Sequence, residues 1–482
     1  MPRPRLSSLV LAGALVLGCA NDGEAKKSAA DVSRPGLDAA DAPDPADASN
    51  AAAADDAASA DERGDEGVPA VEDTSAALAP VPADPWFDAL FAPLRPRWSR
   101  VLDDPARFRF QLLVTVIDPA ATPEARYQTH AYREDAEYVY PASAIKTFAA
   151  VAALRKLGEI RRSEGKRFDL DTPLALCSGR TKRCRTTDDE SNLEGGRITL
   201  GHEIRKMQLV SNNTAFNRLM QFVGFDEFHA DMSAIGFDRT FVHHPLWVGT
   251  LDADETLIAP AWELQPAKGK PLHVDLRERR QPPPPSTLPR TKVGEAYLDE
   301  SRDKARVDEA MDFGEKNFVA LRDFHRLTLG LVADDLPAPH PAELQIPDLG
   351  LETRHAAFLR RAMSEDPLAS KNPVYDDEHK SELRYKTMLE GILRVRPRST
   401  IDYVNKAGRA YGFHLENAYV HDSQSKRAFV VSFVIFVDTD GVLNDDLYEY
   451  DAISRPLLDD LGESLARLVF DGASAARAGS TH

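Results

Sequence analysis

Ser143 and Lys146 are the residues of this sequence whose types and spacing best suit nucleophilic chemistry. They stand three positions apart, shortly after Pro141 and at the start of the alanine-rich stretch 147–154. Proline keeps the chain before it extended and alanine favours helix, so we expect a helix that begins at about Ser143. Residues three apart share one helix face, where the lysine amine can take the proton of the serine hydroxyl. The free amides of a helix N-terminus can stabilise a developing oxyanion.

The Ser-x-x-Lys spacing alone is not specific. It recurs at Ser163, Ser301 and Ser423, in charged, polar or glycine-containing surroundings with no apolar helix behind them. An N-capping serine followed by a solvated lysine is the alternative explanation for Ser143. The assignment therefore depends on other motifs in the chain.

A second polar group follows a predicted helix at 198–210, whose apolar residues have helical spacing. Ser211 and Asn213 stand two positions apart in the next loop and can point into one cleft. The serine can relay a proton to a leaving group, and the amide can hold a substrate carbonyl or orient a lysine. Serine and asparagine are also good N-caps, so this motif alone favours a helix start.

A third group comes much later, at the end of a predicted strand that begins at Ile401. Lys406 closes this strand, Gly408 follows it, and the apolar stretch 429–437 predicts another strand. A lysine on an edge strand can bind a carboxylate, and the next backbone amides can pair with an extended substrate. The same Lys-x-Gly triplet occurs twice elsewhere, but without strands on both sides.

Together, Ser143-x-x-Lys146, Ser211-Asn212-Asn213 and Lys406-Ala407-Gly408 resemble the three motifs of class A β-lactamases and penicillin-binding proteins. The order agrees, and Ser211 follows Ser143 by 68 positions, close to the class A interval. The residues that continue the second motif, 214–219, are also similar to the family. The resemblance covers roughly residues 86–472.

The resemblance implies an α+β fold, in which terminal helices pack on an antiparallel sheet beside a helical subdomain. The helical subdomain would contain residues 143–158 and the second motif. We expect amphipathic helices at 86–102, where prolines interrupt the pattern, and at 447–469. The expected strands of the sheet are 108–117, 127–132, 403–406 and 429–437.

The resemblance also implies an acyl-serine mechanism. Ser143 would be the acylated nucleophile, Lys146 its basic partner, and Ser211 the proton relay. The family's chemistry needs neither a metal nor an organic cofactor, so we expect none here.

Four further residues would bind the substrate on the same grounds. Asn213 would hold a substrate amide, and Lys406 would attract a carboxylate. Gly408 would allow close backbone approach. The amides of Ser143 and Arg409 would form the oxyanion hole.

Three features depart from the family pattern. Asn212 stands where aspartate is usual, and Ala407 where threonine or serine is usual; the missing hydroxyl removes a hydrogen bond worth about 1.5–3 kcal/mol to a charged partner. The Glu-x-x-Leu-Asn motif that supplies the class A deacylation base has no counterpart in the sequence. Glu255, 44 positions after Ser211, is the nearest acidic candidate, although a solvated surface turn is the favoured explanation for it.

The N-terminus predicts an export signal over residues 1–18, with a basic start and a short apolar core. This core is too short to span a bilayer, and a short buried helix is the alternative. The ending Val16–Cys19 resembles the lipobox of bacterial lipoproteins, which implies lipidation of Cys19. We therefore expect a protein that is exported and lipid-anchored to the bacterial membrane, on its periplasmic or extracellular side.

Residues 19–84 predict a disordered acidic tether. From residue 20 they contain 16 Asp and Glu against 4 Lys and Arg, which accounts for −12 of the whole chain's −18. With almost no large apolar side chains, this segment cannot bury enough surface to fold. No basic stripe elsewhere favours nucleic-acid binding.

Residues 85–475 have a globular composition, with inserted loops expected near 255–310 and 364–380. Cys177 and Cys184, seven positions apart in a polar stretch of an exported protein, predict a local disulfide. A metal site is the alternative, which the lack of nearby histidines disfavours.

Three functions remain in competition. The first is a β-lactamase-type serine hydrolase that opens a β-lactam or a related amide, which the spacing and flanks of the first two motifs favour. The second is a D-alanyl-D-alanine peptidase or transpeptidase acting on peptidoglycan, which the missing deacylation base favours. The third is a non-catalytic binding protein on this scaffold, against which the intact Ser143, Lys146 and Ser211 argue.

Overall fold

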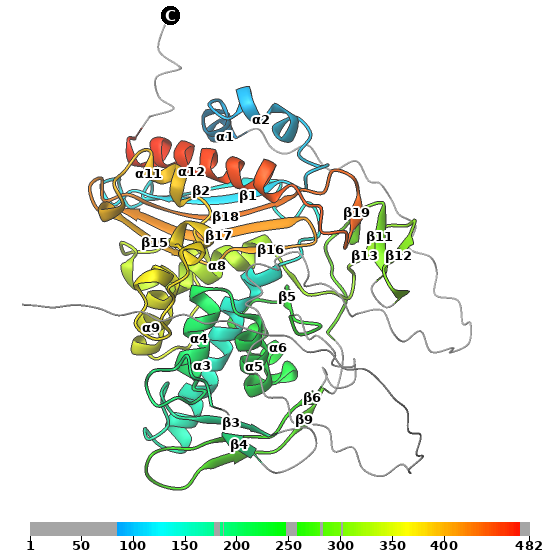
Figure 1. Ribbon diagram of the computed structural model, residues 1–482. Coiled ribbons are helices and arrows are strands. Elements are labelled where there is room, and N and C mark those ends of the chain that lie inside the picture. The colour runs from blue at the N-terminus through cyan, green and yellow to red at the C-terminus, as the bar shows by residue number, and fades with distance from the viewer. Residues whose placement is uncertain are drawn as a thin grey trace, which may run out of the picture. The chain divides into compact units, whose positions relative to one another are not determined.

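The computed structural model describes residues 84–177, 184–186, 188–246, 258–279, 283–299 and 302–472 (Figure 1). The predicted export signal at 1–18, the lipidation site Cys19, nearly all of the tether and Glu255 lie outside these residues. Within them, no helix combines the length and the apolar character needed to cross a bilayer. The predicted domain boundaries and insertions stay predictions.

The main sheet is antiparallel, and its strand order is β15-β17-β18-β1-β2, with β16 paired to β17. Its strands are β1 (Gln111–Ile117), β2 (Tyr127–Tyr132), β15 (Ile401–Asn405), β16 (Gly408–Ala410), β17 (Phe413–Asp422) and β18 (Ala428–Phe436). The predicted pairing of 108–117 with 127–132 is confirmed, since Leu113 lies opposite Ala131. The expected α+β class, with helices on an antiparallel sheet, is confirmed as well.

The sequence did not predict β17, although this strand lies in the middle of the sheet between β15 and β18. Nearly every residue of β17 is buried, yet several are polar, so no apolar pattern indicates a strand. Several of these polar side chains have specific partners: His414 Nδ1 lies 2.7 Å from Ser454 Oγ, and Asn417 Nδ2 donates to Phe324 O at 3.0 Å. These partners offset the cost of burying polar groups.

One face of the sheet is covered by helices from both ends of the domain: α1 (Pro85–Phe91), α2 (Arg95–Leu102), α11 (Leu389–Leu393) and α12 (Arg455–Phe470) (Figure 1). The predicted N-terminal helix is two helices, as its prolines indicated. The C-terminal helix begins later than predicted, after a π-helical turn at Tyr450–Ser454. Its expected core residues are all buried: Ile453, Leu457, Leu458, Leu461 and Leu465.

The other face packs on α8 (Leu321–Leu331), which contacts β17 and β18. Beyond it lies the helical subdomain, made of α3 (Lys146–Ser163), α4 (Leu200–Leu209), α5 (Asn213–Val223) and α6 (Phe225–Ile235), with α9 (Thr353–Ser364) against α4 (Figure 1). Helix α3 is its centre, since every residue from Lys146 to Leu154 is buried. The run of alanines allows this burial, because small side chains let neighbouring helices approach closely.

The rest of the described chain forms short strands in small sheets and the short helix α10 (Glu382–Tyr385). These strands are β3 (Leu174–Cys177), β4 (Cys184–Thr186), β5 (Thr240–Phe241), β6 (Ile258–Ala259), β7 (Trp262–Leu264), β8 (Leu272–Val274), β9 (Arg277–Glu278), β10 (Lys292–Val293), β11 (Ala296–Asp299), β12 (Ala305–Val307), β13 (Met311–Asp312), β14 (Phe318–Val319) and β19 (Val442–Leu443). Two parts of this architecture are used below. One is the sheet β4-β3-β7-β8, and the other is the short strand β16 of the main sheet, beside the candidate site.

Candidate active site

Ser143 lies in a 3₁₀ turn, Ala142–Ile145, that leads directly into α3 at Lys146. The predicted helix start is thus correct in position, with one tighter turn at its beginning. Ala142 has a φ of 46°, a left-handed conformation that costs a non-glycine residue roughly 1–3 kcal/mol and that surrounding packing must offset. This turn sets the Ser143 hydroxyl against the Lys146 amine: Oγ and Nζ are 2.8 Å apart.

The Lys146 amine is completely buried among four polar groups. Besides Ser143 Oγ, it contacts Asn213 Oδ1 at 2.6 Å, Ser211 Oγ at 3.1 Å and the Ser211 carbonyl oxygen. The structure therefore brings together all three residues that the sequence assigned to proton transfer, and Asn213 with them.

Burial, and then the charge of Lys406, hold the pKa of Lys146 well below its usual range. A neutral amine has two N–H donors and one lone pair. Asn213 Oδ1 and the Ser211 carbonyl can only accept, so they take the two donors. The lone pair then faces a hydroxyl, which is the arrangement that a proton acceptor for Ser143 requires.

Asn212, not Ser211, caps helix α5. Its Oδ1 accepts the Ala215 amide at 2.8 Å. Asparagine caps a helix about as well as aspartate, so the change from the usual family residue leaves this cap intact. Ser211 itself has a φ of 64°, and both it and Asn213 are free to face Lys146. The alternative explanation of this motif as a helix cap therefore applies to Asn212 alone.

Lys406 and Gly408 flank the break between β15 and β16. Lys406 is 4% exposed, and burial lowers its pKa to about 7, with the charge of Lys386 acting in the same direction and Glu416 against it. Gly408 touches the turn Ala142–Ile145 that contains Ser143: a Cβ built there would lie 2.6 Å from Ala144 N and 2.9 Å from Ser143 N. Only glycine lets β16 come this close.

Arg409 follows Gly408 on β16. Its guanidinium lies 5.5 Å from the centre of the Tyr450 ring, so the side chain is engaged by the C-terminal segment. The role of the Arg409 backbone amide in an oxyanion hole stays a prediction.

A buried hydrogen-bond network around Glu416, close to Lys406, was not predicted. Glu416 is buried on β17 and accepts hydrogen bonds from Asn405 Nδ2 at 2.8 Å and from the Thr387 amide at 2.8 Å. Its negative charge raises the pKa of Lys406 and so favours the charged amine. Because β17 itself was not predicted, no sequence signal pointed to Glu416.

Asn217 was noted only as a flanking residue, and the structure gives it a role. Its side-chain amide holds the backbone of Leu246 twice: Nδ2 donates to Leu246 O at 2.8 Å, and Oδ1 accepts from Leu246 N at 2.9 Å. These two hydrogen bonds fix Leu246 to α5. Residues 247–257, which include Glu255, follow directly in the sequence. Among the described residues, no carboxylate contributes to the pKa shift of Lys146.

The model of a beta-lactamase enzyme family matches residues 120–270, a range that contains the first two motifs. This match confirms, for that segment, the resemblance that the motifs predicted. No curated protein sequence matches the chain significantly.

Solved β-lactamase structures are similar to the chain over most of its length. A beta-lactamase from Sphaerobacter thermophilus matches with 11% identity and a TM-score of 0.41, covering 80% of this chain and 97% of that one. A class A beta-lactamase from Mycobacterium abscessus matches with 14% identity and a TM-score of 0.40, covering 78% and 99%.

Proposed function

We propose that this chain is a serine hydrolase of the β-lactamase and penicillin-binding-protein type, which forms an acyl enzyme on Ser143. The observation that carries the proposal is the 2.8 Å contact between Ser143 Oγ and a buried lysine amine whose pKa is strongly lowered. The family match over residues 120–270 supports the same reaction class.

Acylation follows from the geometry of these groups. Lys146 takes the proton of Ser143 as Oγ attacks the substrate carbonyl carbon. The resulting oxyanion accepts hydrogen bonds from the backbone amides of Ser143 and Arg409. When the C–N bond breaks, the proton passes from Lys146 through Ser211, whose Oγ is 3.1 Å from Nζ, to the leaving nitrogen. The products of this step are the acyl-serine and a free amine.

Lys406 favours substrates that carry a carboxylate. A bound anion stabilises the charged form of the Lys406 amine, whose pKa is lowered to about 7, mainly by burial. Both β-lactams and peptides that end in D-alanine carry a carboxylate near the scissile amide. Ala407 offers no hydroxyl for that group, so more of the recognition falls on Lys406 and on backbone amides.

The fate of the acyl enzyme separates the two enzymatic candidates. Hydrolysis needs a base that activates water, and Lys146 has no carboxylate among the groups that shift its pKa in the described part of the chain. Glu255 is our candidate for that base in a β-lactamase. If it has no such role, the acyl enzyme persists, and a peptidase or transpeptidase acting on peptidoglycan becomes the better assignment.

Intact-mass spectrometry of the purified protein, followed over time after mixing with a penicillin, tests the proposal. We expect an adduct on Ser143 that clears as the opened penicillin accumulates. A stable adduct assigns the protein to the penicillin-binding peptidases, and the absence of any adduct contradicts the acyl-enzyme proposal and favours a binding protein. In the first case, Glu255→Gln should leave adduct formation unchanged and slow its clearance.

Export and lipid anchoring at Cys19 are also part of the proposal, because an enzyme meets both β-lactams and peptidoglycan peptides outside the cytoplasm. The basic, short apolar start and the lipobox-like Val16–Cys19 support it. Cys19→Ala should move the protein from the membrane fraction to the soluble fraction. Membrane association that persists in this variant contradicts lipidation.

A further inference from the structure

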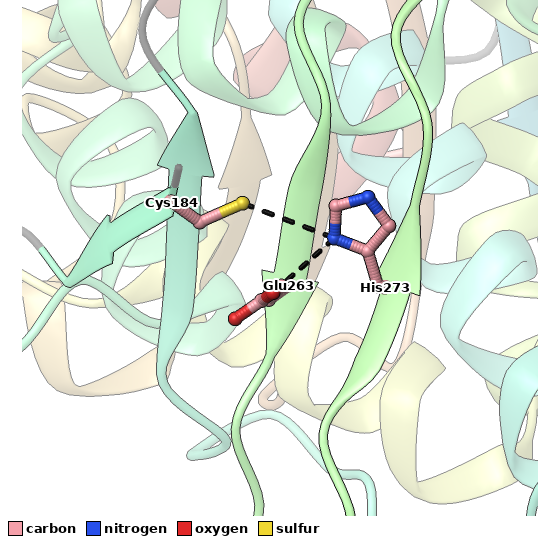
Figure 2. A group of neighbouring side chains, drawn as sticks. All are labelled: Cys184, Glu263 and His273. Atoms are coloured by element: carbon pink, nitrogen blue, oxygen red, sulfur yellow. Dashed lines mark hydrogen bonds and ion pairs between the residues drawn. The ribbon is translucent and has the colours of Figure 1, made fainter. Parts of the chain in front are cut away.

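Three side chains that commonly bind metals meet far from Ser143 in the chain, on the sheet β4-β3-β7-β8 (Figure 2). Cys184 Sγ lies 4.0 Å from His273 Nδ1, and Glu263 Oε1 lies 3.2 Å from the same nitrogen. The three come from β4, β7 and β8. His273 stands 89 positions after Cys184, so the lack of histidines near the cysteines along the chain does not exclude it as a ligand.

The register of the sheet places these groups on one face. Residues directly opposite each other on neighbouring strands point to the same side, as do residues two apart on one strand. Glu263 lies opposite both Ala175 and His273, and Cys177 lies opposite Cys184. Because Ala175 and Cys177 are two apart on β3, all of them share a face. Ala175 has only a methyl group, which leaves Cys184 room to approach His273.

Cys177 and Cys184 are joined in a disulfide, and a disulfide sulfur is a poor metal ligand compared with a thiolate. We propose that reduction of this disulfide converts the cluster into a zinc site, with Cys177, Cys184, Glu263 and His273 as its four ligands. Two thiolates, an imidazole and a carboxylate form a donor set that suits tetrahedral Zn²⁺.

The distances fit such a site. Zinc bonds its nitrogen, oxygen and sulfur ligands in a tetrahedron, which places the ligand atoms roughly 3.3–3.8 Å apart. The contacts of 3.2 Å and 4.0 Å at His273 Nδ1 lie on either side of this range, so small side-chain rotations suffice. Cys177 Sγ is bonded to Cys184 Sγ, and once the disulfide is reduced its side chain must rotate toward Glu263 and His273 to become the fourth ligand.

Asp275 gives the cluster a feature typical of metal sites. Its Oδ1 lies 3.5 Å from His273 Nε2, the nitrogen that faces away from Cys184 and Glu263. Without metal, the 3.2 Å contact has Nδ1–H donating to Glu263 Oε1. Zinc would displace that proton from Nδ1, and the remaining N–H at Nε2 would then donate to Asp275, as a carboxylate partner does at many metal-bound histidines.

The conversion is a two-electron thiol–disulfide exchange. A dithiol reductant transfers two electrons and two protons to the Cys177–Cys184 bond and becomes a disulfide itself. Zn²⁺ then displaces the two thiol protons as it binds the sulfurs. Either the disulfide or the metal links β3 to β4, but only the metal also ties this hairpin to β7 and β8.

Zinc content measured on the whole protein tests the proposal. Oxidised protein and protein reduced with a phosphine are each dialysed against Zn²⁺, and bound metal is measured by plasma mass spectrometry. We expect one tightly bound zinc per reduced chain and none per oxidised chain. Equal zinc in both states, or none in either, overturns the proposal.

Variants identify the ligands. His273→Ala and Cys184→Ser should each weaken zinc binding to the reduced protein by at least tenfold. The matched control is His421→Ala, since His421 also pairs with a carboxylate, Asp402 at 3.1 Å, but lies on β17 of the main sheet; this variant should retain the zinc. Unchanged binding in His273→Ala overturns the assignment.

A variant that folds poorly is handled by a spectroscopic measurement on the reduced wild type. Co²⁺ bound by thiolates gives intense charge-transfer absorption in the near ultraviolet, which oxygen and nitrogen ligands alone do not give. We expect this band to appear on reduction and to disappear when excess Zn²⁺ is added. Its absence in reduced protein mixed with Co²⁺ contradicts the two-thiolate site.

Discussion

Gly408 lies so close to the backbone of Ser143 that a Cβ at position 408 would stand 2.9 Å from Ser143 N. The same atom would lie 2.6 Å from Ala144 N, and both contacts are to backbone that cannot rotate away. We therefore expect Gly408→Ala to push β16 from the turn that contains Ser143 and to separate the two amides of the oxyanion hole. The rate of acylation should fall by about 10²–10³-fold, as when an oxyanion donor is lost, measured by adduct formation with a penicillin.

The control is Gly158→Ala, within α3. A Cβ there meets only the end of the Arg162 side chain, at 3.4 Å, an ordinary contact. Alanine favours helix over glycine by about 1 kcal/mol, so this variant should unfold at a higher temperature and acylate at the wild-type rate. Similar acylation in the two variants would show that Gly408 has no special part in the site.

Ser143→Ala should abolish covalent labelling by a β-lactam, because the variant lacks the hydroxyl that is acylated, and the other hydroxyl beside Lys146, that of Ser211, is assigned to proton relay. The matched control is Ser163→Ala, which removes the serine of another Ser-x-x-Lys sequence, at the end of α3. This control should be labelled like the wild type. Intact mass before and after mixing checks both, and labelling that survives in Ser143→Ala rejects it as the nucleophile.

The pH dependence of acylation should be bell-shaped. On the acid side, the rate constant of acylation rises with pH as Lys146 loses its proton, because the neutral amine is the base. This rise lies at a lower pH than for an ordinary lysine, because the pKa of Lys146 is well below the usual range. On the alkaline side it falls tenfold per pH unit above a pKa near 7, because Lys406 loses the charge that binds the substrate carboxylate.

Lys406→Arg tests the alkaline limb. Arginine keeps its charge to a far higher pH, so the fall above about pH 7 should disappear even if the absolute rate changes. Lys292→Arg, at another Lys-x-Gly sequence on β10, is the control and should keep the wild-type profile. An alkaline limb that is unchanged in Lys406→Arg assigns it to another group.

Asp438→Asn should stabilise the protein, and more so at high pH. Burial, and then the neighbouring Asp440, raise the pKa of Asp438 from 3.8 to about 8. The folded state therefore keeps a proton that the unfolded state loses, so the free energy of unfolding decreases as pH rises from about 4 to 8. After discounting for partial solvent exposure, the gain at pH 8 is on the order of 2 kcal/mol.

Thermal unfolding of Asp438→Asn at pH 4 and pH 8 measures this effect. Asp308→Asn, at an exposed carboxylate paired with Arg306, is the control and should change little at either pH. A gain for Asp438→Asn that is equal at the two pH values would contradict a buried, protonated carboxyl group.

Residues with strong local patterns were predictable from the sequence. The alanine-rich α3, the hairpin of β1 and β2, the apolar β18 and the proline break between α1 and α2 all followed from periodicity and proline chemistry. The contact of Ser143 with Lys146 followed from helical geometry, since it spans a single turn.

What the sequence could not predict depends on contacts between distant segments. Strand β17 is buried with polar residues that depend on partners on α8, in the segment just before α11 and in the π-helical turn at 450–454; Glu416, for example, needs Thr387. The meeting of Cys184 with His273 depends on the pairing of four strands, which no local pattern encodes. The role of Asn212 as the α5 cap, which frees Ser211, likewise became clear only from the hydrogen bond itself.

The pairing of β1 with β18 has a consequence for folding during synthesis. Gln111 on β1 lies opposite Val434 on β18. Strand β1 is synthesised early, but it can pair with β18 only when the chain is almost complete. A nascent chain that has reached α9 already contains Ser143, Lys146 and Ser211, yet β1 still has an open apolar edge, which is prone to aggregate. Truncation directly before residue 428 therefore keeps Ser143 but removes β18, the strand that joins β1 and β2 to β17 and β15, so the main sheet is divided into two parts.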